Sequence, residues 1–370
     1  MPWCVRKCPY CDFNSHAIRG DLPETRYLNA LLKDFEYELR RIEGRELVSI
    51  FLGGGTPSLF SAAAIGALID GIGQRVGLAE SVEISMEANP GSLECAALGP
   101  YREAGINRLS FGVQSFNDQM LARIGRIHDA NEARSALERA RQAGFDNVNI
   151  DLMYGLPGQT PEQAIDDLEQ AMAFGPSHIS HYQLSIEPNT WFHTHRPQLP
   201  DPDSCWEMQL QCQQLLAVQG FAQYEISAYA AETRRCRHNL NYWQFGDYLA
   251  IGAGAHGKVT DPRSGQVARY WKQRHPRQFM DSCEQGGAVV EEKWLRPDDL
   301  LLEFALNAFR LNDGVPTRLL AERTGLSLDV DRDPWRAALE RAWLEISPET
   351  IRPTEEGRRL LNDLTALFLR

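Results

Sequence analysis

The sequence predicts an α/β fold built on a parallel sheet, followed by a small C-terminal domain that is mainly helical. Between residues 24 and 219, short apolar runs alternate with stretches whose apolar residues recur at helical spacing. Such alternation is typical of right-handed βαβ units. From Arg296 onwards the pattern becomes helical, with Leu301, Phe304 and Phe309 on one face. We therefore expect two regions of different architecture.

Each expected element has its own local signal. The apolar run Leu47–Leu52 is stopped by three glycines, and a helix at 61–74 follows it. The other expected strands are 81–87, 108–113, 148–153 and 178–185, and the other expected helices are 24–42, 93–103, a stretch from 118, 131–143, 161–174 and 203–219. We further expect mixed β structure near 223–228, a polar crossing segment at 261–292 and a small β-wing at 344–351.

Composition limits the classes of function. The chain has 370 residues, 43% of them hydrophobic, and a formal net charge of −12. This acidic balance argues against a sequence-independent grip on nucleic acid, because such a grip depends on Lys and Arg facing phosphates. No stretch approaches the ~18 consecutive apolar residues of a membrane span, and the first residues do not begin a signal peptide. We expect a folded, cytoplasmic protein that does not bind nucleic acid.

Three of the eight cysteines stand together at the start of the chain. The spacing Cys4-x3-Cys8-x2-Cys11 places three thiolates on one short loop, where they can hold three irons of a [4Fe–4S] cubane. The fourth iron then stays open for an exogenous ligand such as S-adenosylmethionine (SAM). A structural zinc site usually needs four protein ligands, and no second close pair of Cys or His follows this motif. The spacing therefore favours an iron–sulfur cluster over zinc.

Polar residues stand where the expected strands end. They are Gly53 to Thr56, Glu87 and Asn89, Gln114, Asp151, and Gln183 with Ser185. In a β/α barrel this rim carries the functional site, although loops in general also favour polar residues and glycine. The set as a whole therefore indicates a site more strongly than any one member does. The three glycines leave backbone amides and carbonyls accessible to a ligand.

Five segments resemble, in order, those of the oxygen-independent coproporphyrinogen III oxidase family of radical SAM proteins. They are Cys4-x3-Cys8-x2-Cys11-Asp12-Phe13-Asn14, Gly53-Gly54-Gly55-Thr56-Pro57, Met86-Glu87-Ala88-Asn89-Pro90, Gly112-Val113-Gln114-Ser115-Phe116 and Asn149-Ile150-Asp151-Leu152-Met153-Tyr154-Gly155-Leu156-Pro157. The resemblance spans almost the whole chain. It implies a partial (β/α)6 radical SAM barrel at 1–230, an extension at 231–290 and a winged-helix-like C-terminal domain at 291–370. Family members begin with a strand before the first cysteine, so we expect the first barrel strand to be missing here.

The resemblance also implies which residues bind the cofactors. Cys4, Cys8 and Cys11 would hold the cluster. The positions that would contact SAM are Gly54, Gly55, Thr56, Glu87, Gln114, Arg126 and Asp151. Their chemistry agrees with this role, because carboxylates can bind ribose hydroxyls or an amino group and a guanidinium can pair with the SAM carboxylate.

Two features resemble the haem chaperone branch of the family. The oxidases carry a further cysteine two positions beyond the third cluster cysteine, where this chain has Phe13. The segment His238-Asn239-Leu240-Asn241-Tyr242-Trp243 is similar to a signature of the chaperones, and an imidazole beside aromatic rings is a suitable haem ligand. Composition alone favours a buried structural histidine at this position, and His256 is a second candidate ligand.

The resemblance implies haem binding and delivery to an acceptor protein, with a SAM-ligated cluster serving that role. The alternative is an enzyme that decarboxylates coproporphyrinogen III without oxygen, and a purely structural zinc protein is a third class. The implied partners are haem and a haem-accepting protein, such as a respiratory one. Peripheral membrane association through that partner and a homodimer are further expectations.

Overall fold

The computed structural model describes residues 1–42, 44–91 and 97–369, which form two compact units. The first unit comprises Met1–Lys33, Arg45–Gln223 and Ser227–Arg235. The second comprises Asp34–Gly44, Tyr224–Ile226 and Cys236–Arg370. The first long helix, α1 (Glu24–Glu38), begins in the first unit and ends in the second, so each unit is assembled from separate stretches of the chain.

A seven-stranded sheet forms the centre of the first unit, with the strand order β3-β4-β5-β6-β7-β9-β8. Five strands run parallel: β3 (Leu47–Leu52), β4 (Leu78–Ala88), β5 (Arg108–Gln114), β6 (Val148–Tyr154) and β7 (His178–Gln183). Two short strands, β9 (Ala228–Ala230) and β8 (Ala222–Gln223), extend the sheet in antiparallel pairing. The predicted parallel sheet and the mixed β structure after it are therefore confirmed.

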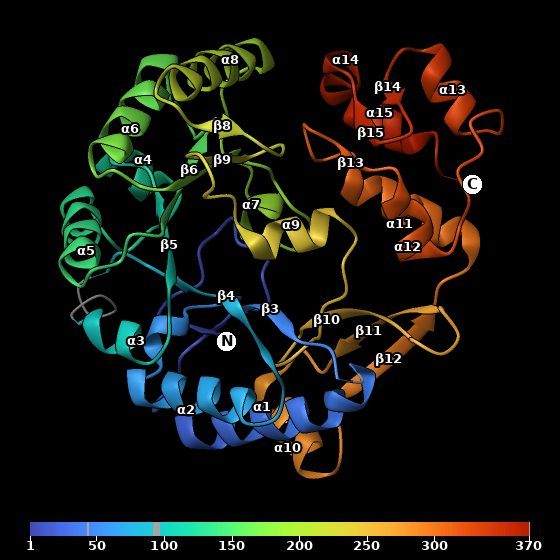
Figure 1. Ribbon diagram of the computed structural model, residues 1–370. Helices are drawn as coiled ribbons and strands as arrows, with labels where there is room; N and C mark the ends of the chain where they lie inside the picture. The colour runs from blue at the N-terminus through green and yellow to red at the C-terminus, as the bar shows by residue number, and fades with distance from the viewer. Residues whose placement is uncertain (43, 92–96, 370) are drawn as a thin grey trace. The chain divides into compact units, whose positions relative to one another are not determined.

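Helices connect these strands and lie on the outer side of the curved sheet (Figure 1). They are α2 (Ala62–Gly73), α3 (Gly99–Glu103), α4 (Asp118–Arg123), α5 (Ala130–Gln142), α6 (Pro161–Ala173) and α8 (Pro202–Val218). The short α7 (Trp191–Thr194) lies between β7 and α8 in the sequence. Local chemistry explains where two of them begin. Asp129 with Glu132 and Thr160 with Gln163 form capping boxes at the starts of α5 and α6. The predicted helix at 93–103 is observed only as α3, and its residues 93–96 lie outside the described part of the chain.

The second unit contains a three-stranded antiparallel sheet in the region predicted to be a polar crossing segment. That prediction was wrong, because 261–292 contains β11 (Val267–Lys272), α10 (Pro276–Glu284) and most of β12 (Val289–Trp294), next to β10 (His256–Thr260). Val267 and Tyr270 are buried, whereas β12 is largely exposed. The polar composition reflects a sheet with one solvated face rather than a linker.

The end of the chain forms a small domain that is mainly helical. Its elements are α11 (Pro297–Ala308), β13 (Val315–Pro316), α12 (Arg318–Thr324), α13 (Trp335–Glu340), β14 (Leu344–Ile346), β15 (Thr350–Pro353), α14 (Glu355–Arg359) and α15 (Leu361–Ala366). Strands β14 and β15 confirm the predicted β-wing. Phe309, Trp335 and Phe368 pack edge to face in the core of this domain.

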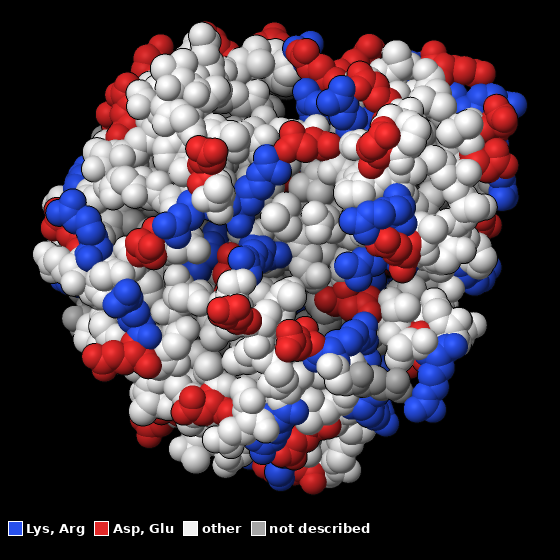
Figure 2. Space-filling model, in the orientation of Figure 1, with Lys and Arg blue, Asp and Glu red and all other residues white. Residues whose placement is uncertain are grey.

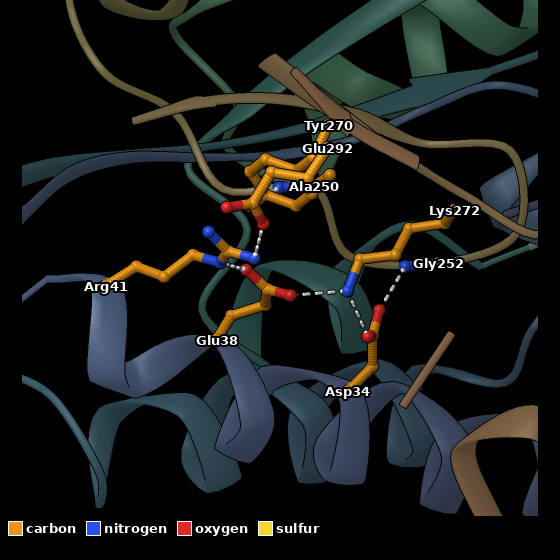
Figure 3. A network of polar contacts seen from close by, with 8 residues as sticks. All are labelled: Asp34, Glu38, Arg41, Ala250, Gly252, Tyr270, Lys272 and Glu292. Atoms are coloured by element: carbon orange, nitrogen blue, oxygen red, sulfur yellow. Dashed lines mark hydrogen bonds and ion pairs between the residues drawn. The ribbon is translucent and has the colours of Figure 1, made fainter. Parts of the chain in front are cut away.

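A buried ionic network ties the end of α1 to β11 within the second unit (Figure 3). The Nζ of Lys272 lies 2.5 Å from Asp34 Oδ1 and 2.6 Å from Glu38 Oε1, and all three side chains are fully buried. The Nε of Arg41 lies 2.7 Å from the other carboxylate oxygen of Glu38. The amide of Gly252 donates to Asp34 at 3.1 Å, so this network also fixes the loop before β10.

The surface carries both acidic and basic side chains, as the composition of the sequence leads us to expect. On the face that Figure 2 shows, acidic and basic side chains are interspersed, and the basic ones do not merge into one continuous area. Within the part of the chain that the structure describes, no helix combines the length and the apolar character needed to span a membrane.

Candidate metal and cofactor site

The three clustered cysteines lie on a closed loop at the start of the first unit. Cys4 ends the short strand β1 (Trp3–Cys4), which pairs in parallel with β2 (His16–Ala17). A tight turn joins the other two, because the amide of Cys11 donates to the carbonyl of Cys8 at 3.1 Å. All three side chains are half-buried and none forms a disulfide. The loop therefore presents three free thiols at one place.

The thiols share one electrostatic environment. Burial raises the pKa of Cys4, and the neighbouring thiols of Cys11 and Cys8 raise it further. Burial likewise raises the pKa of Cys11. Among the described residues, no three His, Cys, Asp or Glu side chains are arranged to hold a single metal ion. A [4Fe–4S] cubane has four irons at separate corners, three of which would each bind one of these thiolates, so thiolates that do not converge on one point fit a cluster better than a mononuclear zinc site.

Packing from distant parts of the sequence holds this loop in place. The guanidinium of Arg6 donates to the carbonyl of Gly125 at 2.7 Å, and the amide of Phe192 donates to the carbonyl of Pro9 at 3.0 Å. Gly125 has a φ of +72°, and a Cβ there would lie 2.5 Å from Cδ of Pro9. The proline between Cys8 and Cys11 therefore fits against bare backbone.

The three glycines after β3 let two chain segments approach closely. The amide of Gly55 donates to the carbonyl of Met1 at 2.6 Å, and the amide of Thr56 donates to the carbonyl of Trp3 at 2.7 Å. The amide of Gly54 donates to Oε2 of Glu87 at 3.0 Å. The amides of Gly54, Gly55 and Thr56 thus bind other parts of the chain, so the glycines serve the close packing of backbone segments.

Two carboxylates interact electrostatically in the first unit: Glu87, near the end of β4, and Asp151, in the middle of β6. Burial and the nearby Asp151 raise the pKa of Glu87 to about 7, while the amide of Gly54 opposes the shift. Burial also raises the pKa of Asp151, which accepts hydrogen bonds from Asn149 Nδ2 at 2.7 Å and from Ser110 Oγ at 3.2 Å. A cationic or hydroxyl-bearing ligand would find two acceptors here.

Asn149 orients Asp151, and the sequence analysis missed this role. Its Oδ1 accepts from Ser180 Oγ at 3.1 Å and contacts His178 Nδ1 at 2.6 Å, which leaves its amide nitrogen to donate to Ser110 and Asp151. The signal was available in principle, because residues two apart on a strand share a face.

Gln114 adopts an unusual backbone conformation at the end of β5. Its φ is +70°, and the pairing between β5 and β6 shifts register between Gly112 and Gln114. Its Oε1 accepts from the hydroxyl of Tyr182 at 2.8 Å. The next turn is anchored by the buried Asp167, which accepts from the amide of Phe116 at 2.6 Å. A left-handed non-glycine residue held by its surroundings is typical of a functional position.

Arg126 connects the cysteine loop to the strand ends. Its guanidinium donates to Oδ1 of Asn89 at 2.8 Å and lies 3.7 Å from Sγ of Cys8. Burial raises the pKa of the neighbouring Tyr10, so its phenol stays neutral. The first unit therefore brings together the residues predicted to bind the cluster and SAM. They are Cys4, Cys8, Cys11, Gly54, Gly55, Thr56, Glu87, Gln114, Arg126 and Asp151.

His238 lies in the second unit, on the short helix α9 (Arg237–Trp243). Its ring meets that of Tyr242 edge to face at 4.8 Å, and Tyr242 contacts the ring of Tyr248 at 4.2 Å. The two asparagines of the motif hold the helix, since Asn239 donates to the hydroxyl of Tyr224 at 3.3 Å and Asn241 donates to the carbonyl of Asp247 at 2.9 Å.

His256, the other candidate imidazole, is exposed at the start of β10. Its ring lies 6.1 Å from that of Trp271. Burial lowers its pKa, and the charges of Arg269 and Arg274 lower it further. A neutral imidazole is the form that binds iron, so His256 is chemically competent as a ligand.

Comparison with known proteins shows which family this chain belongs to. Residues 1–171 match the Radical SAM superfamily, and residues 295–360 match the HemN C-terminal domain. The protein "Heme chaperone HemW" of Haemophilus influenzae is 48% identical over 373 residues, covering 100% of this chain and 96% of that protein. The protein of the same name in Escherichia coli is 47% identical over 369 residues, with the same coverage. The chain belongs to the HemW family.

A solved structure shares the fold of this chain. Coproporphyrinogen III oxidase (HemN) of Escherichia coli, a radical SAM enzyme, matches with a TM-score of 0.82 at 23% identity, covering 100% of this chain and 88% of that one. The predicted radical SAM half-barrel with a helical C-terminal domain is thereby confirmed. Radical SAM membership implies a [4Fe–4S] cluster and SAM as cofactors, and the three clustered cysteines fall within the matched residues.

Proposed function

We propose that this protein binds haem through His238 and passes it to an acceptor protein. The observation that carries the proposal is the arrangement of α9, in which both asparagines hold the helix while His238 and Tyr242, four positions apart, share one face. A partly exposed imidazole beside an aromatic ring suits an axial ligand of haem iron. The identity to curated haem chaperones along the whole chain supports the same function.

A SAM-ligated [4Fe–4S] cluster on Cys4, Cys8 and Cys11 serves this delivery. When bound, the two cofactors supply one-electron chemistry to the site. The chain's own residues bind and orient SAM: Arg126 pairs with its carboxylate, and Glu87 accepts from its amino group. The remaining contacts come from Gly54, Gly55, Thr56, Gln114 and Asp151.

The residue at position 13 disfavours the alternative function, the decarboxylation of coproporphyrinogen III. The position of the additional cysteine of the oxidases is occupied by Phe13, whose side chain is 56% exposed and provides no thiol. Reconstituted protein with SAM, a reductant and the porphyrinogen should form no protoporphyrinogen above a control without protein. Clear product would put the enzyme in place of the chaperone.

The acceptor is a haem-requiring protein, such as a respiratory one. The protein acts in the cytoplasm, whose reducing conditions keep the cluster thiols available. It associates peripherally with membranes through that acceptor, and it can form a homodimer.

Haemin titration tests the role of His238. We expect His238→Ala to shift the Soret band and to weaken haemin binding by roughly a hundredfold, because an axial nitrogen is lost. His256→Ala tests the second candidate, and His275→Ala, which replaces an exposed histidine of the same unit, is the matched control. An unchanged spectrum and affinity in His238→Ala would show that this imidazole is structural.

A further inference from the structure

A buried carboxylate, that of Asp167, lies on α6. The residue is 2% exposed, and each hydrogen bond that it receives from the described residues comes from a neutral donor. Burial raises the pKa of Asp167 to about 7, while the amide of Phe116 and the hydroxyl of Ser115 oppose the shift. A carboxylate buried without a cation is costly, so a side chain that served packing alone would be apolar.

The carboxylate of Asp167 holds the turn that follows Gln114. The amide of Phe116 donates to its Oδ1 at 2.6 Å. The hydroxyl of Ser115 lies 2.9 Å from Oδ1 and 2.8 Å from Oδ2, and it accepts from the amide of Asn117 at 3.0 Å. Because that amide supplies its own hydrogen, the hydrogen of the Ser115 hydroxyl can point at Asp167. Asp167 therefore binds both residues that come directly after Gln114.

The backbone of Gln114 has a conformation that residues with a side chain rarely adopt, with a φ of +70°. The hydroxyl of Tyr182 donates to Oε1 of Gln114 at 2.8 Å, which turns Nε2 the other way. In the described part of the chain no acceptor binds Nε2, so this donor is available to a ligand. The direction of the carboxamide thus depends on the turn that keeps φ positive.

The same carboxylate also binds the loop after β6. Gln159 Nε2 donates to Oδ2 of Asp167 at 3.4 Å, and Gln159 Oε1 accepts from the amide of the fully buried Leu156 at 3.1 Å. Two of the segments that resemble the family, 112–116 and 149–157, are therefore joined through one side chain of α6.

Apolar packing holds the turn after β5 independently of the carboxylate. The ring of Phe116 stacks on that of Phe174, directly after α6, with a centroid distance of 6.1 Å and an interplanar angle of 12°. This packing fixes the ring, but it does not bind the amide of Phe116 or the hydroxyl of Ser115. Loss of the carboxylate should therefore leave α6 and the sheet folded while it releases the polar groups that determine the backbone of Gln114.

We propose that Asp167 is a positioning residue for SAM, which holds the turn after β5 so that the carboxamide of Gln114 points its free donor at the cofactor. Asp167 acts through Gln114 and does not itself touch SAM. This inference rests on the contact between Gln114 and SAM that belongs to the proposed function.

Calorimetric titration of SAM into the anaerobically reconstituted full chain tests the role of Asp167. At pH 8 the carboxylates of Glu87 and Asp167 are both largely ionised, because their pKa values are about 7. We expect Asp167→Ala to weaken SAM binding about tenfold with unchanged iron and sulfide per chain. Asp167→Asn keeps an oxygen that can accept from the amide of Phe116, so it should restore most of the affinity. Asp166→Ala, which changes the exposed neighbour on the same helix, is the matched control and should titrate as wild type does.

A double-mutant cycle separates positioning of Gln114 from general stability. Gln114→Ala should itself weaken SAM binding, and in that background Asp167→Ala should weaken it by less than about twofold more. Ser115→Ala removes only one hydroxyl from the same turn, so it provides the same cycle should Asp167→Ala fail to fold. It should likewise weaken SAM binding only while Gln114 is present.

The other outcomes overturn the inference. Equal losses from Asp167→Ala with and without Gln114 would show a merely structural carboxylate. An Asp167→Asn variant as weak as Asp167→Ala would show that SAM requires the charge rather than the turn. Normal SAM binding in Asp167→Ala together with weakened binding in Gln114→Ala refutes the role of Asp167 and leaves the proposed function standing. Normal binding in Gln114→Ala removes the proposed contact of Gln114 and this inference with it, and a wild-type protein that binds no SAM refutes the whole proposed SAM site as well.

Discussion

Replacing Gly125 by Ala tests whether the shape of the cysteine loop decides cluster retention. An alanine at a φ of +72° costs ~1–2 kcal/mol in backbone strain. Its Cβ would lie 2.5 Å from Cδ of Pro9, about 0.9 Å short of the 3.4 Å at which ordinary contact begins. Proline cannot rotate its ring away, so the loop between Cys8 and Cys11 must move by nearly that amount.

Gly175 supplies a matched control for this variant. It also follows a helix, has a φ of +64°, and has nothing within 4 Å of an added Cβ. Gly175→Ala therefore carries the same backbone strain without the collision. The backbone strain alone should lower the melting temperature of both variants by roughly 2–8 °C, and the collision should lower that of Gly125→Ala further.

The two variants should differ in their iron content. After anaerobic reconstitution, Gly125→Ala should hold markedly less iron and sulfide per chain than wild type, whereas Gly175→Ala should match wild type. Iron and sulfide counting, together with electron paramagnetic resonance of the reduced protein, measures this. Equal iron in both variants would refute the claim that packing of Pro9 against Gly125 positions the thiols.

Three further predictions concern other groups. Cys8→Ser should abolish the four-iron signal, whereas Cys212→Ser, which removes a buried thiol elsewhere, should keep it; a full cluster in the first variant would contradict the assignment. Because the pKa of Glu87 is about 7, its carboxylate becomes protonated as pH falls through 7, so SAM affinity measured by calorimetry should fall about tenfold per unit below that point. Glu87→Gln should remove this dependence, and an equally steep profile in that variant would exclude Glu87. Lys272→Met should destabilise β11 by about 3–5 kcal/mol in amide hydrogen exchange, because it leaves the buried carboxylate of Asp34 without a cation and removes one of the two cations at Glu38. Lys293→Met, which removes an exposed ion pair, should cost at most about 1 kcal/mol, and similar effects of both lysine variants would refute the reasoning.

Local signals were sufficient to predict the order of the elements around the parallel sheet. Leu47–Leu52 is observed as β3 with the predicted bounds, because a short apolar run followed by glycines has few other stable structures. The cysteine spacing likewise indicated its chemistry, since three thiols on one loop need no help from the rest of the fold to be close together.

Contacts between distant positions could not be predicted in this way. Pro9 packs on Gly125 and accepts from Phe192, but no periodicity or composition links these residues. The same limit explains the wrong prediction for 261–292, because a strand with one solvated face is as polar in composition as a linker. Side-chain types indicate what a residue can do, whereas register and packing decide which residues meet.

The buried contact between Lys272 and Asp34 has a consequence for how the chain folds during synthesis. The two residues are 238 positions apart. At a synthesis rate of ~5–20 residues per second, Asp34 waits roughly 12–48 s for Lys272 to be made. The last stretch of the first unit, Ser227–Arg235, is made before Lys272, so that unit can close while the end of α1 is still hydrated. A ribosome that pauses after Arg235 and before Lys272 would therefore hold a nascent chain in which the first unit is complete and two carboxylates still lack their lysine.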